Sequence, residues 1–286
     1  MFQLTLLIWQ LLLPLSAGNI EKSLCWKVSL PGSSKVSYLY GTMHSDDEAV
    51  RRFAPEMLNA FDQCQVFACE VDVGEVTPGK YVGMTMMKDS VLSDLYSDED
   101  WELVNKALGE RLEPMYRVMI MKMKPFYAME IFTTGDQLVI DSTVDAILAM
   151  RAHRLDKKIV ALETVEEAGE AIDQIALKTQ AELLMKVILN PEEEKELEST
   201  MLRLYTEQDL DGMEELYFES DVPGIVTEAI VYQRNRKFSE QLISLMKRKS
   251  VFCAVGALHL PGETGLIKSL RNAGFTVEPF YFEWKN

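Results

Sequence analysis

The sequence predicts an α/β fold: a central mixed sheet flanked by helices, with a helical insertion. Short runs rich in β-branched and aromatic residues, typical of buried strands, occur near both ends of the chain. Between them, apolar residues recur mainly at helical spacing. No linker rich in Pro, Gly or Ser divides the chain, so we expect a single domain over residues 19–286.

The expected elements follow one another with few ambiguities. In chain order the predicted strands are 24–30, 36–40, 65–73, 158–162, 251–255 and 276–281. The predicted helices start at Pro55, Asp98, Pro114, Pro125, Asp141, Val165, Pro191 and Glu263, and Gly274 is expected to cap the last one. The insertion therefore spans about 75–155, and a second long helical region spans 165–248.

The first 18 residues resemble a signal peptide. The apolar run from Leu4 to Leu15 is shorter than the ~20 residues needed to span a bilayer, and the small residues of 16–18 suit cleavage. The usual early positive charge is missing, since the first basic residue is Lys22. We expect export to a periplasm or the cell exterior. An uncleaved leader that anchors the protein near a membrane is the alternative.

Composition limits the partners. The formal net charge of −16 excludes nucleic acid as an expected partner, because phosphate contacts need clustered Lys and Arg. The four cysteines are compatible with small buried residues or with a disulfide, and the absence of a Cys-x-x-Cys pair disfavours a zinc site built from them. The methionines of the insertion could form core or line an adaptable groove. The sequence leaves the oligomeric state open.

Two similar motifs stand at opposite ends of the chain. Gly41-Thr42-Met43-His44 and Gly256-Ala257-Leu258-His259 each end a predicted strand and contain two of the three histidines. We expect Gly41 and Gly256 to let the backbone turn sharply there. Because ligand sites in open α/β sheets lie beyond the carboxyl ends of strands, the motifs predict one site built from both chain ends. The third histidine, His153, is expected to be a hydrogen-bonded structural residue.

Carboxylates follow or interrupt the other strands. Glu70 and Asp72 are expected on one face of their strand, and Glu163 follows the next. Two histidines and a carboxylate are a common ligand set for a divalent metal that activates water. Without a metal, the same groups could perform acid–base hydrolysis. A carboxylate in an apolar strand needs a partner, which could be a metal, Arg234 or a histidine.

These residues resemble the TraB/GumN family, which includes the TIKI proteases and PrgY and is more distantly similar to erythromycin-esterase-like and ChaN-like proteins. The similar segments, spread over about residues 24–282 in the expected order, are 38–44, 70–72, 161–164, 234–236 and 255–262. The resemblance implies the same sheet and metal-dependent peptide cleavage. The family's two Gly-x-x-His motifs and glutamate fall on His44, His259 and Glu70.

From the residues and the resemblance together we assign expected roles to this group. His44, His259 and Glu70 would bind a divalent metal (Mn, Co or Zn), with Glu70 as ligand or general base. Arg234 would stabilise the developing oxyanion. The family's Arg-Asn pair falls on Arg234 and Asn235, which would point into the same cleft.

Two further carboxylates, Glu163 and Asp72, are expected next to these groups, where they would orient a ligating histidine or accept a proton. We therefore predict an exported metal-dependent hydrolase of the peptidase type. The alternative is a protein that binds or sequesters a peptide or a haem-like ligand without turnover.

Overall fold

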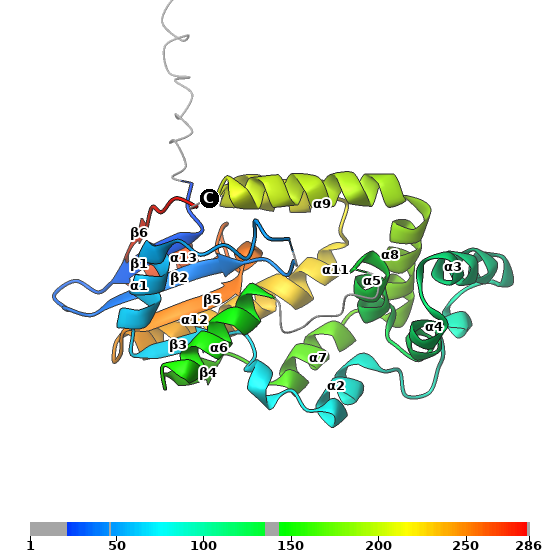
Figure 1. Cartoon of the computed structure of the whole chain (residues 1–286), viewed down its shortest axis with the longest axis horizontal. Coiled ribbons are helices and arrows are strands. Elements are labelled where there is room, and N and C mark those ends of the chain that lie inside the picture. Colours follow the sequence, from blue (N-terminus) through cyan, green and yellow to red (C-terminus); the bar gives the residue numbers. More distant parts are fainter. Residues whose placement is uncertain (1–21, 46, 135–142, 285–286) are drawn as a thin grey trace, which may run out of the picture.

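The computed structural model describes residues 22–45, 47–134 and 143–284, and within them it forms one six-stranded sheet (Figure 1). The strands are β1 (Cys25–Ser29), β2 (Val36–Thr42), β3 (Val66–Cys69), β4 (Lys158–Ala161), β5 (Val251–Gly256) and β6 (Thr276–Pro279). Their order across the sheet is β4-β3-β5-β2-β1-β6. The first four in that order are mutually parallel, whereas β1 is antiparallel to both β2 and β6. The predicted mixed sheet is confirmed.

All six predicted strands are present, with small changes in length. β1 and β2 form a hairpin whose turn contains Gly32, at a left-handed φ of 80° that favours glycine. The largest difference is in β3, which was expected to continue to Val73 but ends at Cys69. Glu70 therefore stands immediately after a fully buried strand, at its carboxyl end, and not within it.

Helices flank the sheet and build the rest of the described chain. The α-helices are α1 (Pro55–Gln63), α2 (Pro78–Thr85), α3 (Asp98–Arg111), α4 (Pro114–Ile120), α5 (Pro125–Thr134), α6 (Val144–Arg154), α7 (Val165–Asp173), α8 (Leu177–Leu189), α9 (Pro191–Thr206), α10 (Leu210–Glu219), α11 (Gly224–Thr227), α12 (Gln233–Met246) and α13 (Leu266–Asn272). The short turns are the 3₁₀ segments η1 (Val73–Glu75), η2 (Leu92–Leu95) and η5 (Ala257–His259), and the π-helical η4 (Glu228–Tyr232).

The predicted helix signals mostly act as expected. Pro114, Pro125 and Pro191 each begin a helix, as the fixed φ of proline favours. The cap of α3 is Ser97, one residue before the predicted Asp98, because the Ser97 hydroxyl accepts the Asp100 backbone N–H at 3.1 Å. The helix expected from 141 starts at 144 in the described residues.

Two large hydrophobic cores hold the fold together, beside a small third cluster of Ile175, Val226 and Ala229. The larger one surrounds the sheet, and in it the ring of Phe61 contacts the rings of Phe67 and Phe252. The second lies among α3, α4, α5 and α8, which form the group on the right of Figure 1, while α9 runs along the top toward the sheet. Leu184 and Val187 of α8 complete this second core. The insertion is therefore closed by a helix from the following region, and not by its own residues alone.

The burial of the methionine and cysteine side chains tests several expectations from the sequence. Met87 and Met123 are buried in the second core, which supports the core interpretation for these two, whereas Met115 is 73% exposed. All four cysteines are buried and free. No helix among the described residues has the length and apolarity to cross a membrane. The signal peptide predicted at 1–18 lies outside the described residues.

Candidate functional site

The carboxyl ends of four parallel strands lie along one edge of the sheet. Thr42 of β2 pairs with Gly256 of β5, and Cys69 of β3 pairs with Ala254 of β5 on one side and with Ala161 of β4 on the other. The two Gly-x-x-His motifs therefore leave the sheet from adjacent strands. The segments that carry Glu70 and Glu163 leave it next to them, so the topology gathers chemistry from both chain ends at one edge.

The two motif glycines allow close packing. A Cβ at Gly41 would lie 3.0 Å from the Ala257 Cα and 3.1 Å from its Cβ, so a larger residue would push the two motifs apart. Gly256 presents its backbone N–H to Oε1 of Glu70 at 2.6 Å. Neither glycine has a positive φ. The reason for glycine here is thus close approach, and not the sharp turn that the sequence suggested.

A buried ion cluster occupies the centre of this edge. Arg234 donates through Nη2 to Oε2 of Glu70 and to Oε1 of Glu163, and through Nε to Oε1 of Glu163 at 3.0 Å. We call these three residues the Arg234 cluster. Their side chains are 18%, 19% and 3% exposed for Arg234, Glu70 and Glu163, respectively. Two carboxylates thus share one guanidinium.

The helix that carries Arg234 contains a π-helical turn. η4 links α11 to α12, and Arg234 follows it by two residues. Its Nη1 also donates to the carbonyl of Ile230 within this turn at 3.1 Å, and the guanidinium lies 5.2 Å from the ring centre of Phe238. These contacts hold the cation in one orientation. Single π-helical turns inside α-helices frequently occur at functional sites.

His259 is oriented by the residue next to Arg234. Its Nδ1 lies 2.7 Å from Oδ1 of Asn235, which can only accept, so the imidazole donates from Nδ1. Nε2 is then an acceptor, 3.3 Å from Nη1 of Arg234 and 3.6 Å from Oε1 of Glu70. Burial lowers the pKa of His259 to about 4, although Glu70 opposes this change. The ring is neutral at pH 7, with its lone pair toward the cluster.

Charge states across the cluster follow from burial and pairing. Burial alone would raise the pKa of Glu70, but Arg234, then His259 and the Gly256 N–H lower it to about 2. Burial raises the pKa of Glu163, and the hydrogen bond from Arg234 only partly offsets this. At neutral pH the site therefore contains an ionised Glu70, a guanidinium cation and a neutral imidazole.

His44 lies apart from this cluster. Its side chain is 66% exposed, and Nε2 is 3.3 Å from Oδ2 of Asp145 at the start of α6. Asp145, whose Oδ1 accepts the Thr42 hydroxyl at 3.0 Å, raises the pKa of His44 to about 9, with a smaller contribution from Glu70. The structure thus brings together Glu70 and His259 of the three predicted metal ligands, and leaves His44 paired elsewhere.

Asp145 is a residue that the sequence analysis missed. It lies in a predicted helix with no spacing relation to either histidine motif, and only the packing of α6 on the sheet brings it to His44. The one available signal was a carboxylate in the first turn of that helix, which is common at helix starts.

Two other predicted positions lie outside these contacts. Asp72 accepts the Gly74 N–H at 2.9 Å and starts η1, because the alternation of β3 stops at Cys69. It therefore caps a turn and, within the described residues, makes no hydrogen bond to the Arg234 cluster. His153 is exposed at the last turn of α6, where a basic residue suits the helix dipole.

The residues at this edge, as arranged, do not fit a metal ion. Within the part of the chain that the structure describes, no group of three or more His, Cys, Asp or Glu side chains is placed to hold one. Arg234 already neutralises Glu70, and His44 is paired with Asp145. The donor types suit a divalent metal, but their positions do not form a coordination shell.

Comparisons with known proteins identify the family to which the chain belongs. The model of the TraB/PrgY/gumN family matches residues 24–279. Metalloprotease TIKI2 of Xenopus tropicalis is 25% identical over 164 residues, which cover 47% of this chain and 31% of that protein. Metalloprotease TIKI2 of Danio rerio is 22% identical over 325 aligned residues, 93% of this chain and 62% of that protein. The chain thus spans about a third to three fifths of these relatives, and no solved structure matches.

Proposed function

Because the chain belongs to the TraB/PrgY/gumN family, we propose that it is a hydrolase that cleaves a peptide bond at the sheet edge containing Glu70, Arg234 and His259. Its similarity to two proteins named metalloproteases supports protease chemistry at the level of the family. The substrate class, a peptide, is part of this proposal.

The observation that supports it most is the fixed, neutral imidazole beside an ionised carboxylate. His259 has one nitrogen bonded to Asn235 and the other directed at Glu70 and Arg234. In the proposed reaction Glu70 orients the attacking water and Nε2 of His259 accepts its proton. Arg234 stabilises the negative charge that develops on the carbonyl oxygen.

Metal dependence is the part of the proposal that needs its own test. The names of the relatives suggest a divalent metal cofactor, and Mn, Co and Zn are the candidates. One feature is compatible with cation binding: the cluster has two carboxylates for one guanidinium. Among the described residues, however, no three such side chains meet in the arrangement above.

The experiment uses the full chain with a mixed peptide library, read by mass spectrometry, with EDTA and with each of the three metals. His259→Ala and Glu70→Gln should abolish cleavage, and His44→Ala should do so if that histidine joins the site. His153→Ala is the matched control, because this histidine is exposed at the end of α6. Cleavage retained by His259→Ala would refute the proposed site, and no cleavage under any condition would refute the activity.

A second candidate function is binding without turnover of a peptide or a haem-like ligand. The observation that favours it is that Arg234 already pairs with Glu70, so the site is stable without an added group. Recovery of an intact ligand from the purified protein, with no cleaved peptide, would support it. Export is likewise proposed from residues 1–18, and fractionation of cells that express the tagged full chain would test it.

A further inference from the structure

One carboxylate holds two residues of the first histidine motif. Asp145 lies in the first turn of α6, and its side chain is 16% exposed. Its Oδ1 accepts the hydroxyl of Thr42 at 3.0 Å, and its Oδ2 lies 3.3 Å from Nε2 of His44. Thr42 is the last residue of β2 and His44 follows it by two residues. A single carboxylate therefore fixes the end of the strand and the imidazole that leaves it.

The oxygen beside His44 has no competing partner. Oδ2 of Asp145 is buried and accepts no hydrogen bond among the described residues, where its ion pair is with His44. A buried carboxylate oxygen without a donor is costly, so His44 is the group placed to satisfy it. Because a carboxylate oxygen only accepts, Nε2 of His44 carries the hydrogen of this pair. Nδ1 then remains as the nitrogen that can meet another group.

This carboxylate lies one strand away from Glu70. Thr42, which Asp145 holds, pairs with Gly256 in the parallel ladder of β2 and β5. The N–H of Gly256 donates to Oε1 of Glu70 at 2.6 Å. His44 is also close enough to Glu70 for each side chain to shift the pKa of the other. Asp145 and Glu70 therefore hold the ends of neighbouring strands, and His44 lies within electrostatic range of the candidate site.

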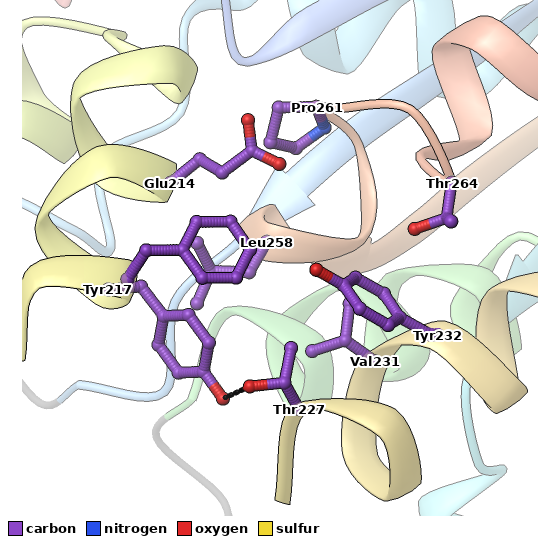
Figure 2. A pocket seen from close by; sticks show the side chains of 9 residues that line it. Glu214, Tyr217, Thr227, Val231, Tyr232, Leu258, Pro261 and Thr264 are labelled. Carbon is purple, nitrogen blue, oxygen red and sulfur yellow. Dashed lines mark hydrogen bonds between the residues drawn. The ribbon is translucent and has the colours of Figure 1, made fainter. Parts of the chain in front are cut away.

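The second motif has an amide in place of this carboxylate. Nδ1 of His259 lies 2.7 Å from Oδ1 of Asn235. The Glu214 carboxylate, near the same turn, lies beside Pro261, as Figure 2 shows, and makes no hydrogen bond to His259 in the described chain. The two histidines are therefore held through different nitrogens, Nε2 in His44 and Nδ1 in His259.

We propose that Asp145 is a positioning residue of the site, which holds Thr42 and His44 together so that His44 contacts the substrate through Nδ1. The partner of one imidazole nitrogen sets the orientation and the role of the other. His44 is 66% exposed, so its ring is open to a bound peptide. Such pairs are often long without substrate and tighten in the complex. This inference rests on the proposed function for its substrate, but the contact itself is measurable without turnover.

The contact is tested by NMR titration of the full chain labelled at its three histidines. Asp145 raises the pKa of His44 from 6.5 to about 9. Asp145→Asn keeps the size of the side chain and removes its charge, so the His44 pKa should fall by at least about one unit. Asp62→Asn is the matched control, because Asp62 bonds Arg151 of the same helix at 2.8 and 2.6 Å. This control should leave the His44 pKa unchanged. An unchanged pKa in Asp145→Asn, or equal falls in both variants, would overturn the inference.

The role in the reaction is tested with the peptide that the wild type cleaves best. Asp145→Asn should lower kcat about 10–100-fold and change KM less than about threefold, because positioning acts on the reacting group more than on binding. Thr42→Val removes the other contact of the carboxylate and should lower kcat by a smaller factor. Asp62→Asn should keep the wild-type kcat.

A loss of kcat in Asp62→Asn as large as in Asp145→Asn would overturn the inference, because docking of α6 alone would then explain both. Full activity of His44→Ala would also overturn it. If the wild type cleaves no peptide, the proposed function fails, and the NMR titration decides by itself whether Asp145 holds His44.

Discussion

Replacement of Arg234 by methionine should destabilise the protein strongly at neutral pH. The change removes the cation between Glu70 and Glu163 and keeps an apolar side chain of similar length. Two largely buried carboxylates then lose their common partner. Removal of one partner of a buried ion pair typically costs about 3–5 kcal/mol, because the remaining charge is desolvated and unpaired.

The expected loss of stability can also be calculated from the change in the pKa of Glu70 on folding. Its pKa falls from 4.5 to about 2 on folding, and Arg234 is the largest favourable cause. That difference corresponds to ~3.4 kcal/mol at 1.36 kcal/mol per pKa unit. Because the folded pKa is the lower one, this stabilisation is fully present above about pH 4.5 and is lost as the pH falls toward 2. At pH 3 only ~1.4 kcal/mol remains.

The assay is urea unfolding of the wild type and of Arg234→Met at pH 7 and pH 3. The free-energy difference between them should be about 3 kcal/mol at pH 7 and less than half of that at pH 3. Arg236→Met is the matched control, because Arg236 is on the same helix, is 59% exposed and pairs only with the exposed Glu228. It should cost under ~1 kcal/mol. The reasoning would be refuted if Arg234→Met lost no more unfolding free energy than Arg236→Met, or if its loss were the same at pH 7 and pH 3.

Three further results are expected. Gly41→Ala should destabilise the protein by ~1–3 kcal/mol in urea unfolding, because the added Cβ meets Ala257. The control Gly79→Ala places its Cβ in open space and should not destabilise the protein. Equal effects of the two changes would contradict the packing argument. Asn235→Asp should raise the His259 pKa above about 4 in an NMR titration, and an unchanged value would contradict their hydrogen bond. The four buried cysteines should react with Ellman's reagent only after unfolding, and rapid labelling of the native protein would contradict their burial.

The sheet was predictable because its strands are short, apolar and bounded by turn residues. Six strands were expected and six are found in the described chain. The convergence of their ends was also predictable, since parallel strands direct their carboxyl ends to one edge. Glu70 needed a buried partner on energetic grounds, and Arg234 was among the alternatives.

The remaining features depend on packing between distant segments. The pairing of His44 with Asp145 requires α6 to lie against the sheet edge, which no spacing rule encodes. The second core depends on α8 closing the insertion, and helical periodicity does not identify the partner of an apolar face.

The position of β5 has a consequence for synthesis of the chain. This strand, residues 251–256, lies between β3 and β2 and connects the two halves of the sheet. Until it leaves the ribosome, β2 and β3 each expose an unpaired edge and an apolar face. The sheet therefore cannot close until translation has nearly finished, and chains interrupted before residue 251 should aggregate rather than accumulate as folded fragments.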